Sequence, residues 1–386
     1  MSIGYAIRGA DWRKRIDSKG LASVLEGMES LWTERKQSVD RWSVMDLAEH
    51  LIPNGREFLR NIGPGKSGRA NLFEASQSVS TADFSNVIGQ IFYTKIREAF
   101  DNTELIGDQL VTDFPTTFLG GEKIAGIGRI GDEFEAVAEG HNYPRAGLNE
   151  EWVESPAAVK RGTILEVTRE AMITDRTGVL TQRASAIGEY LAINKEKRIL
   201  DVATGQVNNY KRNGTSTNTY LTSGAYINVS TSAALTDWTD IEAGLLIQDQ
   251  ITDPNTGEFL NWGADTLLVP VALKMTAMRI MQATDIRFGD GASNTTAAYG
   301  KNPVSNMPMK ILSNAYVRNA TSSTTTWFMG CPKKAFWYSS IWNIETTQAA
   351  SNNQAEFERD VFLSYKTTEF GVPWAYEPRY MIKCTA

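Results

Sequence analysis

A run of carboxylates in the first half of the chain is the strongest candidate for chemistry or binding. Between Gly131 and Glu154 the acids outnumber the bases by seven to one, Arg145 being the single base. A segment this polar cannot form a core, so its carboxylates either stay in solvent or lie on a basic patch of another chain. A catalytic carboxylate pair would also need a cleft and one raised pKa, neither of which a sequence reveals. The acids are Asp132, Glu133, Glu135, Glu139, Glu150, Glu151 and Glu154.

A predicted long helix supplies the candidate basic partners of these acids: Lys195, Lys197 and Arg198. Helical spacing projects Lys197 away from the apolar stripe, whereas Lys195 and Arg198 continue the stripe and must extend their stems to reach water. With six of the acids they form the set of candidate inter-subunit contacts. These six are Asp132, Glu133, Glu135, Glu139, Glu150 and Glu151.

Other motifs have simpler structural explanations. "GIGRIG" (126–131) matches a dinucleotide-binding pattern, but an acidic stretch follows where an amphipathic helix should hold the pyrophosphate, so flexible loop glycines are favoured. "DPNTGE" (253–258) lacks the remaining ligands of a calcium loop and predicts a turn. His50 and His141 have no neighbouring nucleophile in the sequence and are interpreted as surface or cap residues. We therefore assign no catalytic, cofactor-binding or metal-binding residue.

Composition indicates a large protein with an ordinary hydrophobic core. The 386 residues exceed one ordinary domain. The formal net charge of -6 argues against a protein whose main function is to bind the phosphate backbone of a nucleic acid. Cys331 and Cys384 are too few for a disulfide framework and are expected to be reduced, small apolar residues. No segment has the pattern of a signal peptide or a membrane span, so we expect folding in a cytoplasm.

The pattern along the first half of the chain predicts helices, then an extended hairpin. Residues 1–75 form a helical arm ending in a glycine-rich linker, with 12 basic and 9 acidic residues among the first 70. An apolar stripe predicts a helix over 81–100. Residues 116–160 then read as a long hairpin or extended loop, and "TILEVTREAMIT" as a strand entering a short helix.

The second half opens with the strongest helix, over 178–204, with an apolar stripe (Leu180, Ala184, Ile187, Leu191, Val202) and Gly205 as its stop. A polar stretch over 206–236 permits only short strands. The block that follows mixes helices and strands. It includes a polar loop over 284–308, and a loop of this length usually has a function or binds a partner. The expected elements are a capped helix in "DWTDIEAGLLIQDQI", a buried strand in "ADTLLVPV", a helix in "ALKMTAMRIMQAT", and strands in "MKILSNAYV", "TWFMGCP" and "KAFWYSS".

The stretch "FERDVFLSYKTTEFGVPWAYEPRYMIKC" (357–384) is too aromatic to remain disordered, so it must be buried. It and two other stretches, "KRGTILEVTREAMITDRTGVLTQRASAIGEYLAINKEKRIL" and "ADTLLVPVALKMTAMRIM", resemble the major capsid proteins of tailed bacteriophages with the Hong Kong 97 type fold, particularly Mu-like prophage head subunits. The resemblance covers about residues 80–386.

The resemblance implies an α+β subunit with named parts. These are an N-terminal extension (1–75), a helix leading to the peripheral domain (76–115), an E-loop reaching over a neighbour (116–160), a peripheral domain (161–234) with its spine helix (178–204), an axial domain (235–330) and C-terminal return strands (331–386). It further implies pentamers and hexamers of the chain itself, portal and scaffold or decoration proteins, enclosed double-stranded DNA, no cofactor, no membrane, and a virion capsid assembled in the bacterial host cytoplasm. Some relatives cross-link this loop covalently, but no motif assigns such a link here, although Lys123 and Asn352 are conceivable partners.

Two alternatives remain open at this point. One is an encapsulin-like bacterial nanocompartment, which would enclose an enzyme instead of a genome. The other is an unrelated cytoplasmic hydrolase, in which the acids of residues 131–154 line a cleft.

Overall fold

The computed structural model describes residues 95–101, 103, 105–128, 136–143, 151–168, 170–171, 179–260, 262–288, 298–349 and 358–386. The chain divides into two compact units. One comprises 1–104, 160–193 and 343–369, and the other 105–159, 194–342 and 370–386. The predicted arm over 1–75 lies outside the described residues; of the predicted helix over 81–100, residues 95–100 are described and helical.

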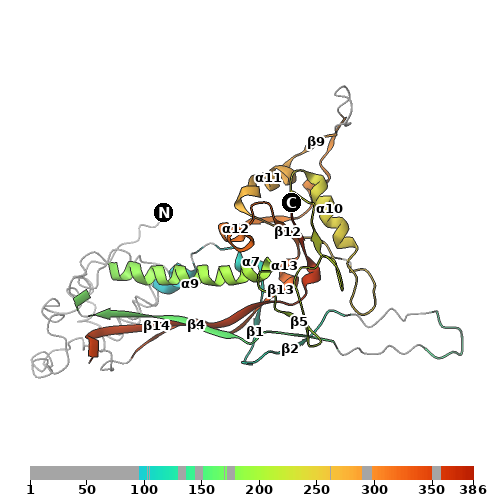
Figure 1. Ribbon diagram of the computed structural model, residues 1–386. Coiled ribbons are helices and arrows are strands. Elements are labelled where there is room, and N and C mark those ends of the chain that lie inside the picture. Colours follow the sequence, from blue (N-terminus) through green and yellow to red (C-terminus); the bar gives the residue numbers. More distant parts are fainter. Residues whose placement is uncertain are drawn as a thin grey trace, which may run out of the picture. The chain divides into compact units, whose positions relative to one another are not determined.

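Helices and strands alternate irregularly, which confirms the α+β class (Figure 1). The helices are α7 (Gly107–Leu110), α9 (Val179–Ala203), α10 (Trp238–Asp249), α11 (Val271–Gln282), α12 (Ala315–Thr321), α13 (Pro332–Ala335) and the 3-10 turns η1 (Pro303–Asn306) and η2 (Pro378–Tyr380). The first strands are β1 (Thr112–Pro115), β2 (Lys123–Ala125), β3 (Trp152–Glu154), β4 (Val159–Thr168), β5 (Tyr210–Arg212), β6 (Thr215–Thr217), β7 (Val229–Ser230) and β8 (Thr266–Val269). The remaining strands are β9 (Asp285–Phe288), β10 (Ala298–Lys301), β11 (Lys310–Ser313), β12 (Trp327–Gly330), β13 (Phe336–Gln348), β14 (Val361–Ala375) and β15 (Met381–Cys384).

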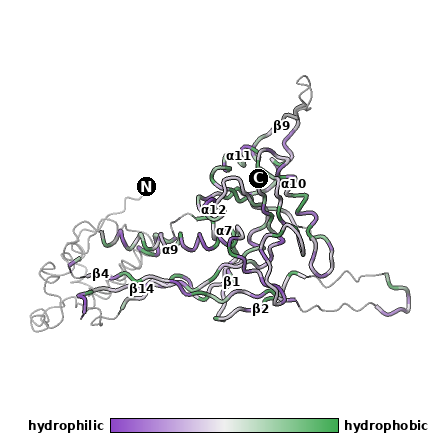
Figure 2. The backbone as a smooth tube through the Cα atoms, viewed as in Figure 1, coloured by the Kyte–Doolittle hydropathy of each residue, from purple (hydrophilic) through white to green (hydrophobic). Residues whose placement is uncertain are grey.

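The predicted long helix is α9, and local signals set its end. Gly205 adopts φ +76°, and its N–H donates to the carbonyl of Val202 at 3.0 Å, which closes the last turn as expected. Figure 2 shows hydrophobic and hydrophilic residues alternating along α9. Of the predicted stripe, Leu180, Ala184 and Val202 are buried, while Ile187 and Leu191 are only half-buried.

A five-stranded mixed sheet in the order β11-β8-β12-β15-β7 organises the second unit. Its side chains alternate between two cores, because successive residues of a strand point to opposite faces. Leu268, Phe328 and Met381 pack with the C-terminal part of α9, whereas Leu267, Met329 and Ile382 pack with residues of α10 and α11. Both faces are covered, so β8 and β12 are buried at all four of their positions.

Two predictions of local structure were wrong. "MKILSNAYV" is strand β11 only as far as Ser313; Asn314 then caps α12 by accepting the N–H of Tyr316 at 3.2 Å. Likewise the polar loop of 284–308 contains the antiparallel pair β9–β10 and the turn η1. In contrast, the capped helix α10, the buried strand β8, helix α11 and strand β12 lie where predicted.

The aromatic stretch is buried as predicted. It forms β14, η2 and β15, and Tyr365 and Trp374 are almost inaccessible to solvent. Trp374 contacts the rings of Trp337 and Tyr376 edge-on, at centroid distances of 5.8 and 5.9 Å. These contacts explain why the stretch does not remain a free tail.

Both cysteines are free and buried, as predicted. Burial raises the pKa of Cys331 from 9.0 to about 11 and that of Cys384 to about 12, so both thiols are protonated near pH 8. We expect Ellman's reagent at pH 8 to label neither cysteine in the folded protein and to label both in about 8 M urea. Rapid labelling of the folded protein would contradict this packing.

Candidate functional site: the base of the extended hairpin

The base of the predicted hairpin is a short antiparallel sheet. Lys123, Ile124 and Ala125 of β2 pair with β3, and Val153 of β3 pairs with Arg212 of β5. Val153 is 1% exposed and belongs to the core that contains α9. The sheet therefore ties the two segments that lead into the hairpin to the body of their unit.

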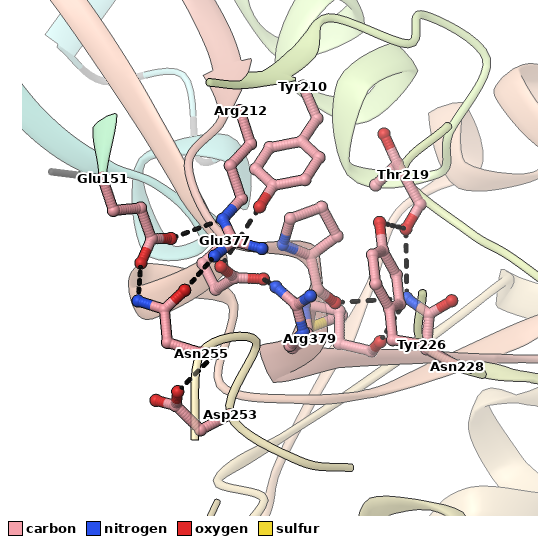
Figure 3. Close-up of polar contacts among 12 residues, drawn as sticks. Glu151, Tyr210, Arg212, Thr219, Tyr226, Asn228, Asp253, Asn255, Glu377 and Arg379 are labelled. Atoms are coloured by element: carbon pink, nitrogen blue, oxygen red, sulfur yellow. Dashed lines mark hydrogen bonds and ion pairs between the residues drawn. The ribbon is translucent and has the colours of Figure 1, made fainter. Parts of the chain in front are cut away.

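Three side chains close a triangle beside this sheet, and we call Glu151, Arg212 and Asn255 the hairpin clasp (Figure 3). Arg212 Nε donates to Glu151 Oε1 at 2.5 Å, and Arg212 Nη2 donates to Asn255 Oδ1 at 2.9 Å. Asn255 Nδ2 donates to Glu151 Oε2 at 2.7 Å. Each residue thus contacts the other two, and the side chain of Glu151 is only 5% exposed.

A second ion pair lies on the same strands. Lys211 of β5 pairs with Glu154 of β3, and Trp152 Nε1 donates to Glu154 at 3.1 Å. The hydrogen bond from Lys211, followed by that from Trp152, holds the pKa of Glu154 below its ordinary value. Two adjacent residues of β5 therefore each bind an acid of the hairpin base.

Tyr210, the residue of β5 that precedes Lys211, belongs to a buried polar network (Figure 3). Tyr210 Oη donates to Glu377 Oε2 at 3.3 Å, and Arg379 Nη1 donates to Glu377 Oε1 at 2.9 Å. Glu377 and Arg379 are 0% and 2% exposed, and the guanidinium lies 4.7 Å from the ring centroid of Tyr226. Burial alone would lower the pKa of Arg379, but the Glu377 carboxylate outweighs it and raises that pKa, so the guanidinium stays charged.

Asn228 completes this network by joining backbone segments. Its Nδ2 lies within 3.0 to 3.2 Å of the carbonyls of Thr219, Pro378 and Met381, and its Oδ1 accepts from the N–H of Leu221. The side chain is fully buried. Its side chain therefore links the loop after β6 to the segment around η2.

The predicted contact residues have different environments. Glu139 is exposed, Glu151 belongs to the hairpin clasp, and the other four acids (Asp132, Glu133, Glu135, Glu150) lie outside the described residues. Lys195 pairs with Asp108 at 2.8 Å, Lys197 lies 5.2 Å from the ring of Tyr316, and Arg198 Nε donates to Asn194 Oδ1 at 3.0 Å. Contact of these residues with another subunit stays a prediction.

The sequence motifs that resemble ligand sites have structural roles. Gly126 and Gly128 pack against the hairpin clasp, and "DPNTGE" is a turn in which Asp253 Oδ1 accepts the N–H groups of Asn255 and Thr256. His141 is exposed, while His50 lies outside the described residues. Within the described part of the chain, no group of three or more His, Cys, Asp or Glu residues could hold a metal ion. None of the described helices is both long and apolar enough to cross a membrane.

Sequence reasoning missed Arg212, Asn255 and the Glu377–Arg379 pair. The pair did leave a signal, since opposite charges two residues apart inside an aromatic stretch are able to pair if the stretch is buried. Arg212 and Asn255 left none, because they lie 61 and 104 residues from Glu151 in the chain.

Comparison with known proteins gives one family and a set of distant structures. Residues 152–384 match the family model described as phage capsid protein. No curated protein matches the chain. Among solved structures, the capsid of cyanophage P-SCSP1u is 12% identical, with a TM-score of 0.45 over 72% of this chain and 86% of that one. A phage-related protein of Bordetella bronchiseptica is 13% identical, with a TM-score of 0.43 over 75% of this chain and 95% of that one.

Proposed function

The chain belongs to the phage capsid protein family, and from this premise we propose that it is the major head subunit of a tailed double-stranded DNA bacteriophage or prophage. The observation that carries the proposal is the family match over residues 152–384, which confirms the resemblance predicted from the sequence. Family membership makes it a structural protein of the virion capsid. In the proposed role, copies of the chain assemble into an icosahedral shell around the genome.

Exposed apolar side chains support burial against further copies. Large apolar residues scattered singly are normal on a protein surface, but a shell subunit must cover much of its surface at repeated contacts. Met275 and Val271 of α11 are 76% and 54% exposed, and Leu246 of α10 is 59% exposed. The other large exposed apolar residues in the described part of the chain are Phe118, Leu119, Tyr143, Val159, Ile164, Tyr190, Val207, Ile227 and Phe259.

Each part of the chain has an expected role in this shell. Residues 116–160 are the loop that reaches over a neighbouring subunit, 178–204 the spine helix of the peripheral domain, and 235–330 the axial domain at capsomer centres. Residues 331–386 supply the return strands, and 1–75 a separate extension. Pentamers and hexamers, portal, and scaffold or decoration proteins are the proposed partners, assembled in the host cytoplasm.

The direct test is electron microscopy of the purified full chain together with light scattering. We expect closed shells, tubes or capsomers, because weak contacts gain strength when each subunit makes several at once. A protein that stays monomeric across salt and pH would overturn the proposal. Native particles that hold an enzyme and no DNA would instead indicate a nanocompartment.

The acid run gives a second test of assembly. Changing Glu133, Glu135 and Glu139 to Gln should lower particle yield at physiological salt, since each lost exposed ion pair removes ~0.2–1 kcal/mol and every copy repeats the loss. Circular dichroism of the unassembled subunit should stay unchanged. The matched control replaces three acids of other segments, the exposed Glu189, Glu242 and Glu258, with Gln. Equal yields from both triple variants would exclude a specific role for the acid run.

A further inference from the structure

The hairpin clasp is built where the pairing of β2 with β3 ends. The last backbone bond at this edge runs from the N–H of Gly126 to the carbonyl of Glu151 at 3.3 Å. Ala125, one residue earlier, accepts a hydrogen bond from Tyr376 Oη at 2.7 Å. On one strand, Ile127 still packs against the core that holds α10 and α11, and on the other, Glu151 is the first described residue after 144–150.

Two members of the clasp, Arg212 and Asn255, lie in backbone that is itself hydrogen-bonded. Arg212 pairs with Val153 on one side and Thr215 on the other. Asn255 lies in a turn closed by Asp253, whose carbonyl accepts the N–H of Gly257 at 3.0 Å while its N–H donates to Glu258 at 2.7 Å. Figure 3 shows the Glu151 carboxylate bonded both to Arg212 and to Asn255. The clasp therefore receives Glu151 on a prearranged surface.

Two glycines of the earlier "GIGRIG" motif make this approach sterically feasible. A Cβ at Gly126 would lie 2.5 Å from Glu151 Oε1, closer than side chains tolerate. A Cβ at Gly128 would collide with both Glu151 Oε2 and Asn255 Nδ2. The colliding atoms are ends of side chains, so a methyl group at Gly128 can be accommodated if the clasp opens while the backbone stays folded.

We propose that Glu151, Arg212 and Asn255 are positioning residues for assembly: the hairpin clasp fixes the direction in which the chain leaves the sheet after Gly128 and returns to it at Glu151, and Gly128 permits the clasp to close. The inference rests on the proposed function for its effect on shells. If the hairpin contacts a neighbouring copy, the direction in which it leaves its own subunit sets the angle between the two subunits. A loosened base should therefore yield particles of variable size without unfolding the subunit.

The first experiment measures the clasp in the unassembled subunit. Hydrogen exchange of the amides in residues 123–128 and 151–154 should accelerate about tenfold in Gly128→Ala and Glu151→Gln, while exchange in β8 and β12 stays unchanged. Gly263→Ala is the matched control, because a Cβ there meets nothing within 4 Å. Unchanged exchange at the hairpin base in both variants overturns the clasp, whether or not shells form.

The second experiment measures particle diameters by cryo-electron microscopy. Both variants should lower the yield of particles with the wild-type diameter about tenfold, and adding Gly128→Ala to the double change Glu151→Ala, Asn255→Ala should have no further effect. Additive losses, or wild-type diameters in both variants, overturn the positioning role. Failure of the wild-type chain to assemble would instead refute the proposed function, and the exchange experiment would still decide the clasp.

Discussion

Arg379→Ala is expected to lower the free energy of unfolding by about 3–5 kcal/mol, because it leaves the buried Glu377 carboxyl without its cationic partner. Glu377 also accepts the backbone N–H of residue 379 at 3.2 Å and the hydroxyl of Tyr210 at 3.3 Å. These neutral donors cannot replace the guanidinium charge. Urea unfolding of the unassembled subunit, followed by tryptophan fluorescence, measures the loss.

A paired replacement is the control for this prediction. Glu377→Leu combined with Arg379→Met removes both charges and keeps apolar volume, so it should cost less than Arg379→Ala alone. Arg379→Lys keeps the charge but loses the planar group that lies over Tyr226, and an intermediate loss is expected. If the paired replacement is as unstable as the single change, the charge argument fails.

Trp327→Ala should cost about 3–5 kcal/mol of stability, which is typical for truncating a fully buried aromatic residue. Trp327 is 0% exposed on β12 and packs in the core that holds α10 and α11. Its Nε1 donates to the carbonyl of Ala233 at 2.8 Å. The same urea titration measures the effect.

Two further variants test this prediction, one for the hydrogen bond of Trp327 and one as an exposed control. Trp327→Phe keeps most of the ring volume but leaves the Ala233 carbonyl without its donor, so about 1–3 kcal/mol is expected. Tyr190→Ala removes an aromatic ring that is 72% exposed and should change the stability of the unassembled subunit by less than about 0.5 kcal/mol. Similar losses for Trp327→Ala and Tyr190→Ala would contradict the assigned core.

Elements whose signals are local were predictable from the sequence. The capping box of α10 joins Asp237 and Asp240, three residues apart, and the stop of α9 needs only Gly205. Strand β8 was predicted because an uninterrupted apolar run favours a strand buried on both faces. In "MKILSNAYV" the apolar run gave the wrong answer beyond Ser313, because Asn314 starts a helix that places Val317 in the core.

The site was only partly predictable because its contacts are long-range. Glu151 was selected as one of many acids, yet the sequence could not show that it differs from the exposed Glu139. That difference comes from Arg212 and Asn255, which the fold brings to it from β5 and from the 253–258 turn. Gly126 and Gly128 of "GIGRIG" were correctly interpreted as loop residues, but the carboxylate packed against them appears only in three dimensions.

The position of β15 has a consequence for synthesis of the protein. It pairs with β12 on one side and β7 on the other, and residues 370–386 complete a unit that begins at Leu105. The two cores on either side of that sheet cannot close until residue 384 has emerged from the ribosome, so early folding of this unit during translation is incomplete. We therefore expect neighbouring nascent chains on one messenger RNA to complete this unit only after release, before they can assemble.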